Sequence, residues 1–170
     1  MTLYTLRPIE PVDKPAVARL LVESWGSVMV YAVALGGLLD ASTLPGWIVE
    51  QQRQVVGLLT YRINGATLDI VTINAFRTGA GVGTALVEKL AGQASALGAR
   101  RIRVATTNDN TDALRFYQRR GFRLTGVRPD AMTKARRKHK PELPEIGHHG
   151  IPIRDEVDLE LDVTSSTGRR

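Results

Sequence analysis

Apolar and polar residues recur with two different periods along the chain, and these periods predict both strands and helices. Residues 55–63, 68–73 and 101–107 are short apolar runs rich in β-branched residues, which are typical of strands. Residues 157–163 alternate between apolar and acidic side chains, as in a strand with one buried face. Between 82 and 97, apolar residues instead recur at helical spacing, with polar residues between them.

The order of these elements predicts the topology at the centre of the fold. Asn64 and Gly65 stand between two strands and favour a hairpin, because a type I′ turn needs positive φ at both central positions. The strand at 68–73, the helix at 82–97 and the strand at 101–107 form a βαβ unit, whose two strands should be parallel. An antiparallel hairpin beside a parallel pair predicts an α+β fold with a mixed sheet.

The regions outside this centre are less regular. A helix should begin at Lys14, with Asp13 as its N-cap. The apolar stretch at 27–39 is interpreted as a second short helix and a loop. Residues 129–152 show no regular pattern, and so long a connection is either functional or disordered. Residues 164–170 are predicted to be a frayed tail.

The composition fits one folded domain spanning residues 1–170. Hydrophobic residues make up 43% of the chain, which is enough for a core. The absence of cysteine excludes disulfides, thiolate metal sites and a cysteine nucleophile, and it fits a cytoplasmic protein. No apolar stretch is long enough to span a membrane, and the N-terminus lacks the features of a signal peptide. We therefore expect a cytoplasmic protein without a membrane partner.

The net charge of +6 leaves two interpretations open. Basic residues are spread along the chain, and a basic surface suits a polyanionic ligand. The densest run, at 134–140, would in a nucleic-acid-binding module give salt-sensitive binding. That run has no interleaved aromatic residue to stack on bases. Solvated loop charge is the simpler interpretation, and a nucleic-acid partner is not expected.

A glycine-rich turn, RTGAGVGT at 77–84, connects the strand at 68–73 to the helix at 82–97. The first N–H groups of a helix lack intrahelical partners, and glycine lets an anion approach them closely. A phosphate or pyrophosphate is the natural ligand. A Walker loop is excluded because no lysine precedes Thr84, and a dinucleotide fingerprint because Leu86 occupies the third glycine place. A structural turn with incidental glycines is the alternative.

Two motifs together resemble the GCN5-related N-acetyltransferase (GNAT) family. The turn is similar to the acetyl-CoA pyrophosphate loop, Gln/Arg-x-x-Gly-x-Gly/Ala, with Gly81 and Gly83 in the glycine places. Thr78 falls in the Gln/Arg place and departs from the pattern. The stretch NTDALRFYQRRGF at 110–122 resembles the family's second signature, Asn-x-x-Ala followed by Tyr and Gly-Phe. The resemblance covers residues 5–127.

The resemblance implies a fold and an activity. The fold is a mixed sheet of six or seven strands with helices on both faces and a central parallel strand pair that splays apart. The activity is acetyl transfer from acetyl-CoA to the primary amine of a small molecule or protein, without a metal. The attacking amine must be neutral, and the leaving thiolate needs a proton. A homodimer is compatible with the family. A catalytically silent CoA-binding sensor is a rival, supported by the departure at Thr78.

The resemblance also implies roles for the cofactor-binding residues. The backbone around Ile73 and Ala75 should pair with the amides of the pantetheine arm. Asn110 should contact the same arm, and Tyr117 should lie near its sulfur as the general acid. A core tyrosine is the alternative for Tyr117. The pyrophosphate should lie on the N–H groups of Gly79, Ala80, Gly81, Val82, Gly83 and Thr84.

The general base and the acceptor site are expectations of the same kind. Asp69 occupies a region where relatives often carry a glutamate, and it is the candidate base, with a water chain as the alternative. Histidines at 148 and 149 qualify only by their chemistry. The charged run of Arg154, Asp155 and Glu156 should flank the acceptor side of the cleft together with residues 25–40. A structural ion pair is the alternative for this run.

Overall fold

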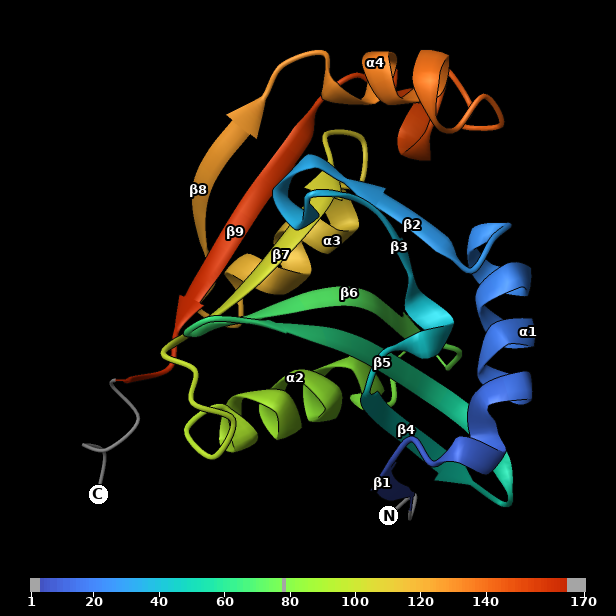
Figure 1. Cartoon of the computed structure of the whole chain (residues 1–170), viewed down its shortest axis with the longest axis vertical. Coiled ribbons are helices and arrows are strands. Elements are labelled where there is room, and N and C mark those ends of the chain that lie inside the picture. Colours follow the sequence, from blue (N-terminus) through green and yellow to red (C-terminus); the bar gives the residue numbers. More distant parts are fainter. Residues whose placement is uncertain (1–3, 78, 165–170) are drawn as a thin grey trace.

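The computed structural model describes residues 4–77 and 79–164 and contains a seven-stranded mixed sheet (Figure 1). Only β6 and β7 pair in parallel, and every other neighbouring pair is antiparallel. This confirms the predicted mixed sheet. In spatial order the strands are β1 (Thr5–Pro8), β4 (Gly46–Gln51), β5 (Gln54–Asn64), β6 (Thr67–Ala75), β7 (Arg101–Thr107), β9 (Glu156–Asp162) and β8 (Arg123–Arg128).

The sheet has helices on both faces because side chains alternate along its strands. Ile48 and Leu58 point to the face covered by α1, whereas Val49 and Leu59 point to the face covered by α2 and α3. The expected helices on both faces are therefore present. The helices are α1 (Lys14–Trp25), α2 (Val82–Gln93), α3 (Thr111–Gln118) and α4 (Ala131–Lys138).

The two parallel strands at the centre of the sheet, β6 and β7, pair along only about half of their length. The pairing joins residues 67–70 of β6 to residues 101–104 of β7. Beyond this register the two strands diverge, and Figure 1 shows β6 leaving β7 on the way to its C-terminal end. The β5–β6 register shifts where β6 passes Val71, and such a bulge bends the strand that carries it. The expected splayed pair is confirmed.

Residues 27–39 form two short strands instead of the expected helix and loop. These are β2 (Met29–Ala32) and β3 (Gly37–Asp40), which pair antiparallel across the 3₁₀ turn η2 (Val33–Leu35). Gly36 and Gly37 both have positive φ, which lets the chain reverse here. An apolar run this short has no period that separates a strand from a helix, which is why the prediction was wrong.

The connection at 129–152 is also more regular than predicted, since it contains α4. Ala131, Met132 and Ala135 are buried and pack on Ile153 in a small separate core. Three small or flexible apolar side chains among basic residues give a weak helical signal, so the sequence pattern missed the helix. Of the predicted tail at 164–170, only Thr164 lies within the described residues.

Two local predictions need adjustment. The β5–β6 hairpin is confirmed, but its two-residue turn lies one position later, between Asn64 and Thr67, and within it only Gly65 has positive φ, at 58°. Asp13 precedes α1 without capping it, because its carboxylate accepts hydrogen bonds from Arg7, at 2.7 and 3.0 Å, and from the Glu10 N–H. Within the described part of the chain, no helix has both the length and the apolar character needed to cross a membrane.

Candidate active site

The glycine-rich turn leads from the open end of β6 directly into α2. Gly81 is the residue before the helix and has φ of 70°, a conformation that strains any other residue. An added Cβ at Gly79 or Gly81 would meet no atom within 4 Å, so the space over the turn is open. Gly83 differs, because its Cβ would lie 3.1 Å from the Phe116 ring of α3. Thr78 lies outside the described residues.

The strand edge beside this turn is free on the β7 side. Ile73 and Ala75 pair with β5, opposite Leu59 and Gly57, whereas the β6–β7 pairing has already ended at Ile70. Backbone groups of the open half that point toward β7 therefore have no partner strand there. The free edge and the turn at 79–84 follow each other along the chain, as an elongated ligand with amides and phosphates requires.

A pocket of about 260 Å³ lies where the two strands diverge. Val71 of β6 and residues 105–107 of β7 form its base, and residues of α1, β2, α4 and the segment 143–153 form its walls. Trp25 in this wall is fixed by a 2.9 Å hydrogen bond from its Nε1 to Asn74 Oδ1 on β6. The wall contains the apolar or aromatic residues Trp25, Val30, Tyr31, Leu35, Met132, Leu143, Pro144 and Ile153, and the carboxylates Asp109 and Glu156.

Asp109 is a pocket residue that the sequence analysis missed. It is 1% exposed, and its Oδ2 accepts a 2.9 Å hydrogen bond from the backbone N–H of His148. Its Oδ1 has no hydrogen-bond partner among the described residues. The chain at Gly147 passes so close that an added Cβ there would lie 2.0 Å from Asp109 Oδ2. The sequence signal was an acidic residue at the end of a strand, directly before the asparagine that begins the second motif.

The residues on either side of Asp109 have structural roles. Asn108 Oδ1 accepts backbone N–H bonds from Arg154 and Asp155, both at 2.9 Å, and so fixes the start of β9. Asn110 Oδ1 accepts the Ala113 N–H at 3.1 Å and caps α3, while the residue also lines the pocket. The predicted contact of Asn110 with the cofactor arm is compatible with this position.

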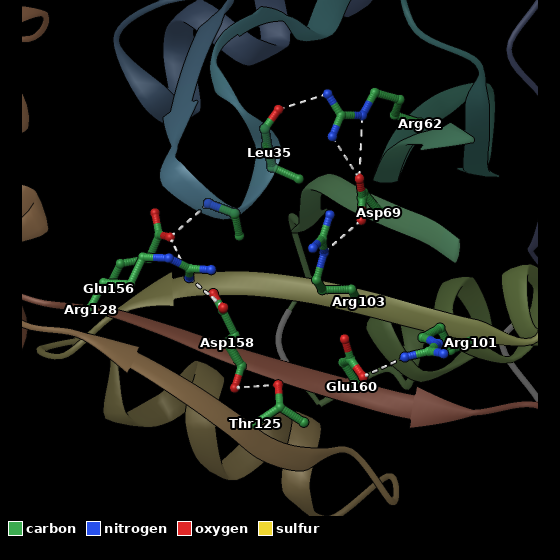
Figure 2. Close-up of polar contacts among 11 residues, drawn as sticks. Leu35, Arg62, Asp69, Arg101, Arg103, Thr125, Arg128, Glu156, Asp158 and Glu160 are labelled. Atoms are coloured by element: carbon green, nitrogen blue, oxygen red, sulfur yellow. Dashed lines mark hydrogen bonds and ion pairs between the residues drawn. The ribbon is translucent and has the colours of Figure 1, made fainter. Parts of the chain in front are cut away.

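Glu156 is the one residue of the charged run at 154–156 that lines the pocket. Its carboxylate accepts the N–H groups of Val33 and Ala34, at 2.7 and 2.9 Å. It also accepts a 3.0 Å hydrogen bond from Arg128 (Figure 2). These donors attach η2 to β9. Asp155 Oδ1 accepts the Asp130 N–H at 2.8 Å. The expectation for Arg154 and Asp155 is therefore revised, because neither lines the pocket and Asp155 holds the chain before α4.

The structure also revises the expectation for Asp69, the candidate base. Asp69 is fully buried in the closed half of the β6–β7 pair and is not among the residues that line the pocket. Its Oδ2 accepts a 2.8 Å bond from Arg62, and its Oδ1 accepts a 2.8 Å bond from Arg103 (Figure 2). Arg62 also donates to the Leu35 carbonyl at 2.7 Å. Both oxygens are committed to guanidinium groups, so Asp69 is a structural anchor.

Tyr117 lies in the main core between Phe116 and Phe122, with ring centroids 5.1 and 5.2 Å away. Burial raises the pKa of its phenol above the usual range, and the nearby Arg120 acts in the opposite direction. The phenol therefore stays protonated at neutral pH. Tyr117 is not among the described residues that line the pocket.

The remaining candidates lie at the edge of the site. His148 lines the pocket and reaches Asp109 through its backbone, whereas His149 pairs with the exposed Asp112 at 3.1 Å. In the basic run, Arg136 donates to the backbone carbonyls of three residues, and Lys140 donates to a fourth. These contacts hold the segment that walls the pocket. The described residues contain no group of three or more potential metal ligands.

The amino-acid sequence matches a known protein family and a protein of Bacillus subtilis. The model of the acetyltransferase (GNAT) family matches residues 10–122. The chain is 34% identical over 151 residues to the protein YdhI of Bacillus subtilis (strain 168), which covers 88% of this chain and 92% of YdhI.

Solved structures share the same arrangement of strands and helices. IAA acetyltransferase from Bacillus cereus ATCC 14579 superposes with a TM-score of 0.73 at 22% identity, covering 94% of this chain and 99% of that one. A GNAT family acetyltransferase from Elizabethkingia anophelis, solved with acetyl-CoA bound, superposes with a TM-score of 0.66 at 18% identity, covering 94% and 97%. The mixed sheet with helices on both faces is thus that of an acetyltransferase fold. The chain belongs to the GNAT acetyltransferase family, as the two sequence motifs predicted.

Proposed function

We propose that this protein transfers the acetyl group of acetyl-CoA to the primary amine of a small molecule. The observation that carries the proposal is the opening between β6 and β7, which has the glycine turn at one end and the pocket at its base. A pocket of about 260 Å³ is at the small end for ligand sites, and it favours a small acceptor over a polypeptide segment.

The residues of the opening fit the successive parts of acetyl-CoA. The turn residues Gly79, Ala80 and Gly81 are exposed, and the space over the two glycines is open, so we propose that their backbone N–H groups bind the pyrophosphate. The free edge of β6 at Ile73 and Ala75 offers backbone groups to the pantetheine amides. Val82, Gly83 and Thr84 complete the first turn of α2. A bound pyrophosphate would gain from both the unpaired N–H groups and the helix dipole.

Tyr117 is proposed as the source of the proton that the leaving sulfur needs. A phenol is protonated at neutral pH, as a general acid must be, and burial, which raises the pKa of Tyr117, does not change this. Asn110, two helical turns earlier on the same segment, caps α3 and is proposed to contact the pantetheine arm. Bound acetyl-CoA supplies the activated acyl group. The protein binds and orients acetyl-CoA and supplies the proton that the leaving sulfur takes up.

The test combines binding with turnover. Acetyl-CoA should raise the melting temperature of the wild type, because a ligand that binds only the folded state stabilises it. Gly81→Glu should abolish this shift by placing a like charge where the pyrophosphate binds. Gly92→Glu is the matched control, because Gly92 lies exposed at the other end of α2 with no atom within 4 Å of an added Cβ.

Turnover separates the enzyme from its rival. With a panel of small primary amines, the wild type should release free CoA in proportion to acetylated amine. A thermal shift without turnover on any amine would identify a CoA-binding sensor instead. A melting curve that millimolar acetyl-CoA leaves unchanged would rule out the cofactor assignment itself.

A further inference from the structure

Building on the proposed acetyl transfer, we propose that Asp109 receives the acceptor amine. Its carboxylate binds the incoming ammonium group and removes the proton that blocks attack. The acceptor is a small primary amine with an apolar or aromatic body and no carboxylate of its own. The inference rests on three observations: the unpaired oxygen of Asp109, its position in the pocket, and the chemistry of the pocket wall.

The first observation is the incomplete hydrogen bonding of Asp109. A buried carboxylate oxygen without a donor is costly, and most buried polar atoms in proteins have a partner. Asp109 Oδ2 has the His148 N–H, while Oδ1 has no partner in the described part of the chain. An ammonium group brings up to three donors and a positive charge. It is the ligand that would satisfy this oxygen best.

The other buried carboxylates are not available for this role. Asp158 pairs with Arg128 and does not line the pocket. Both carboxylate oxygens of Asp69 already accept hydrogen bonds, one from Arg62 and one from Arg103. Glu156 shares the pocket but accepts two backbone N–H groups and an Arg128 bond. Asp109 is therefore the carboxylate in the pocket wall with the least-used hydrogen-bonding capacity.

The second observation is the place of Asp109 along the chain. It follows the open end of β7, whose last residues form the base of the pocket, and it precedes Asn110 at the start of α3. Across the opening stands the free edge of β6, where the acetylated arm is proposed to lie. An amine on Asp109 would therefore enter from the β7 side and meet the acyl group between the two strands.

The third observation is the chemistry of the wall, which defines the acceptor. Of the described residues in the wall, the charged ones are Asp109 and Glu156, and both carry a negative charge. The other large side chains are apolar or aromatic. A carboxylate on the acceptor would be repelled by these two groups, whereas an apolar body would be buried favourably.

The proton balance of the step is simple. The acceptor enters as R–NH₃⁺ and gives one proton to Asp109, which passes it to solvent after turnover. The nitrogen lone pair then forms the C–N bond to the acyl carbon, and the C–S bond breaks with its electron pair on sulfur. Tyr117 gives the sulfur its proton, and the second nitrogen proton, which is lost as the amide forms, restores the phenol. The products are the acetamide, free thiol and one released proton.

Asp109→Asn tests the role because it keeps the shape and the His148 contact but removes the negative charge. At pH 7, kcat/KM for the amine should fall about 100-fold, within the range typical of general base catalysis. The acetyl-CoA thermal shift should stay as in the wild type. Asp112→Asn, the same change at an exposed carboxylate three residues later, should stay within threefold.

The pH dependence of the defect separates proton removal from a merely structural role. Near pH 9.5, close to the pKa of about 10 of an alkylamine, much of the acceptor is already neutral, so the Asp109→Asn defect should shrink below tenfold. The titratable groups around Asp109 in the pocket are Glu156 on β9, Tyr31 on β2 and His148, and all are present in both proteins. A defect of equal size at both pH values, or none at pH 7, would overturn the proposal.

Wild-type protein provides an independent test if the variant folds poorly. 2-Phenylethylamine and phenylalanine differ by one carboxylate, and the amine should have at least a tenfold higher kcat/KM. Equal rates, or a preference for phenylalanine, would contradict the inferred acceptor class while leaving acetyl transfer intact. No turnover on any amine in the panel would instead count against the proposed function.

Discussion

The two halves of the β6–β7 pair differ in strand pairing and in what lies beside the strands. In the closed half, residues 67–70 and 101–104 form a continuous parallel ladder, and Asp69 joins Arg62 and Arg103 beside it. In the open half, beyond Ile70, β6 diverges from β7 and a pocket takes the place of the ladder. The same two strands thus serve first as scaffold and then as site.

The buried carboxylates show what this difference teaches. Asp69 in the closed half has a guanidinium on each oxygen. Asp109 at the open half has one backbone donor and one unpaired oxygen. Complete pairing is usual for buried polar groups, so the unpaired oxygen of Asp109 needs an explanation, and its position in the pocket wall favours a ligand. Burial alone does not separate the two, because both residues are almost inaccessible to solvent.

The largest effect should come from breaking the closed half. Asp69→Ala leaves two guanidinium groups facing each other without their carboxylate, and we expect the free energy of unfolding to fall by about 3 kcal/mol. This is the lower end of the range for buried pairs, because Arg62 and Arg103 are 26% and 21% exposed. Urea unfolding followed by tryptophan fluorescence measures the change.

The matched control for Asp69→Ala is Asp112→Ala. Asp112 is 57% exposed and pairs with Arg115 on the surface, so its loss should cost less than about 0.5 kcal/mol. If Asp69→Ala cost no more than this control, the triad would not be what holds the closed half together.

A smaller effect is expected where the two helices that follow the diverging strands touch. Gly83 on α2 lets the Phe116 ring of α3 approach, and Gly83→Ala would place a methyl group 3.1 Å from that ring. We expect a loss of about 1 kcal/mol from overpacking. Gly92→Ala, at an open site of α2, should instead be neutral or stabilising, as alanine is the better helix former. Equal stabilisation by both changes would show that the α2–α3 contact has room to spare.

The smallest effect concerns pH. Burial raises the pKa of Tyr117 in the folded state above its value of about 10 in the unfolded chain. The folded state therefore holds this proton more tightly, and its contribution to stability is complete below pH 10 and declines as pH rises further. Denaturant unfolding between pH 8 and 11 should show a steeper alkaline loss for the wild type than for Tyr117→Phe. Parallel curves would mean that the phenol is hydrated in the folded state.

Much of the scaffold could be predicted from the sequence because its signals are local. The alternation at 157–163 marks one strand of the sheet, and the glycine turn before α2 marks the change from strand to helix. The order of these elements defined the parallel pair, and the motif at 110–122 placed α3 beside it. Each signal depends on the period or spacing of neighbouring residues.

The site was harder to predict because its decisive features depend on contacts distant in sequence. Asp69 and Asp109 both stand near strand ends, and only the structure shows that arginines from β5 and β7 meet Asp69 while residues 147–148 cover Asp109. Helix α4 was missed because its buried face is short and most of its other residues are basic. Its role as part of the pocket wall follows from tertiary packing.

The most direct test of this account is hydrogen–deuterium exchange with and without saturating acetyl-CoA. Backbone amides at 71–76 and 79–84 should exchange at least tenfold more slowly when acetyl-CoA is bound. Amides at 67–70 and 101–104, in the closed half, should keep their rates and serve as the internal reference. If the protection instead left the open half and the glycine turn unchanged, acetyl-CoA would not bind between the diverging strands, and the central claim would be wrong.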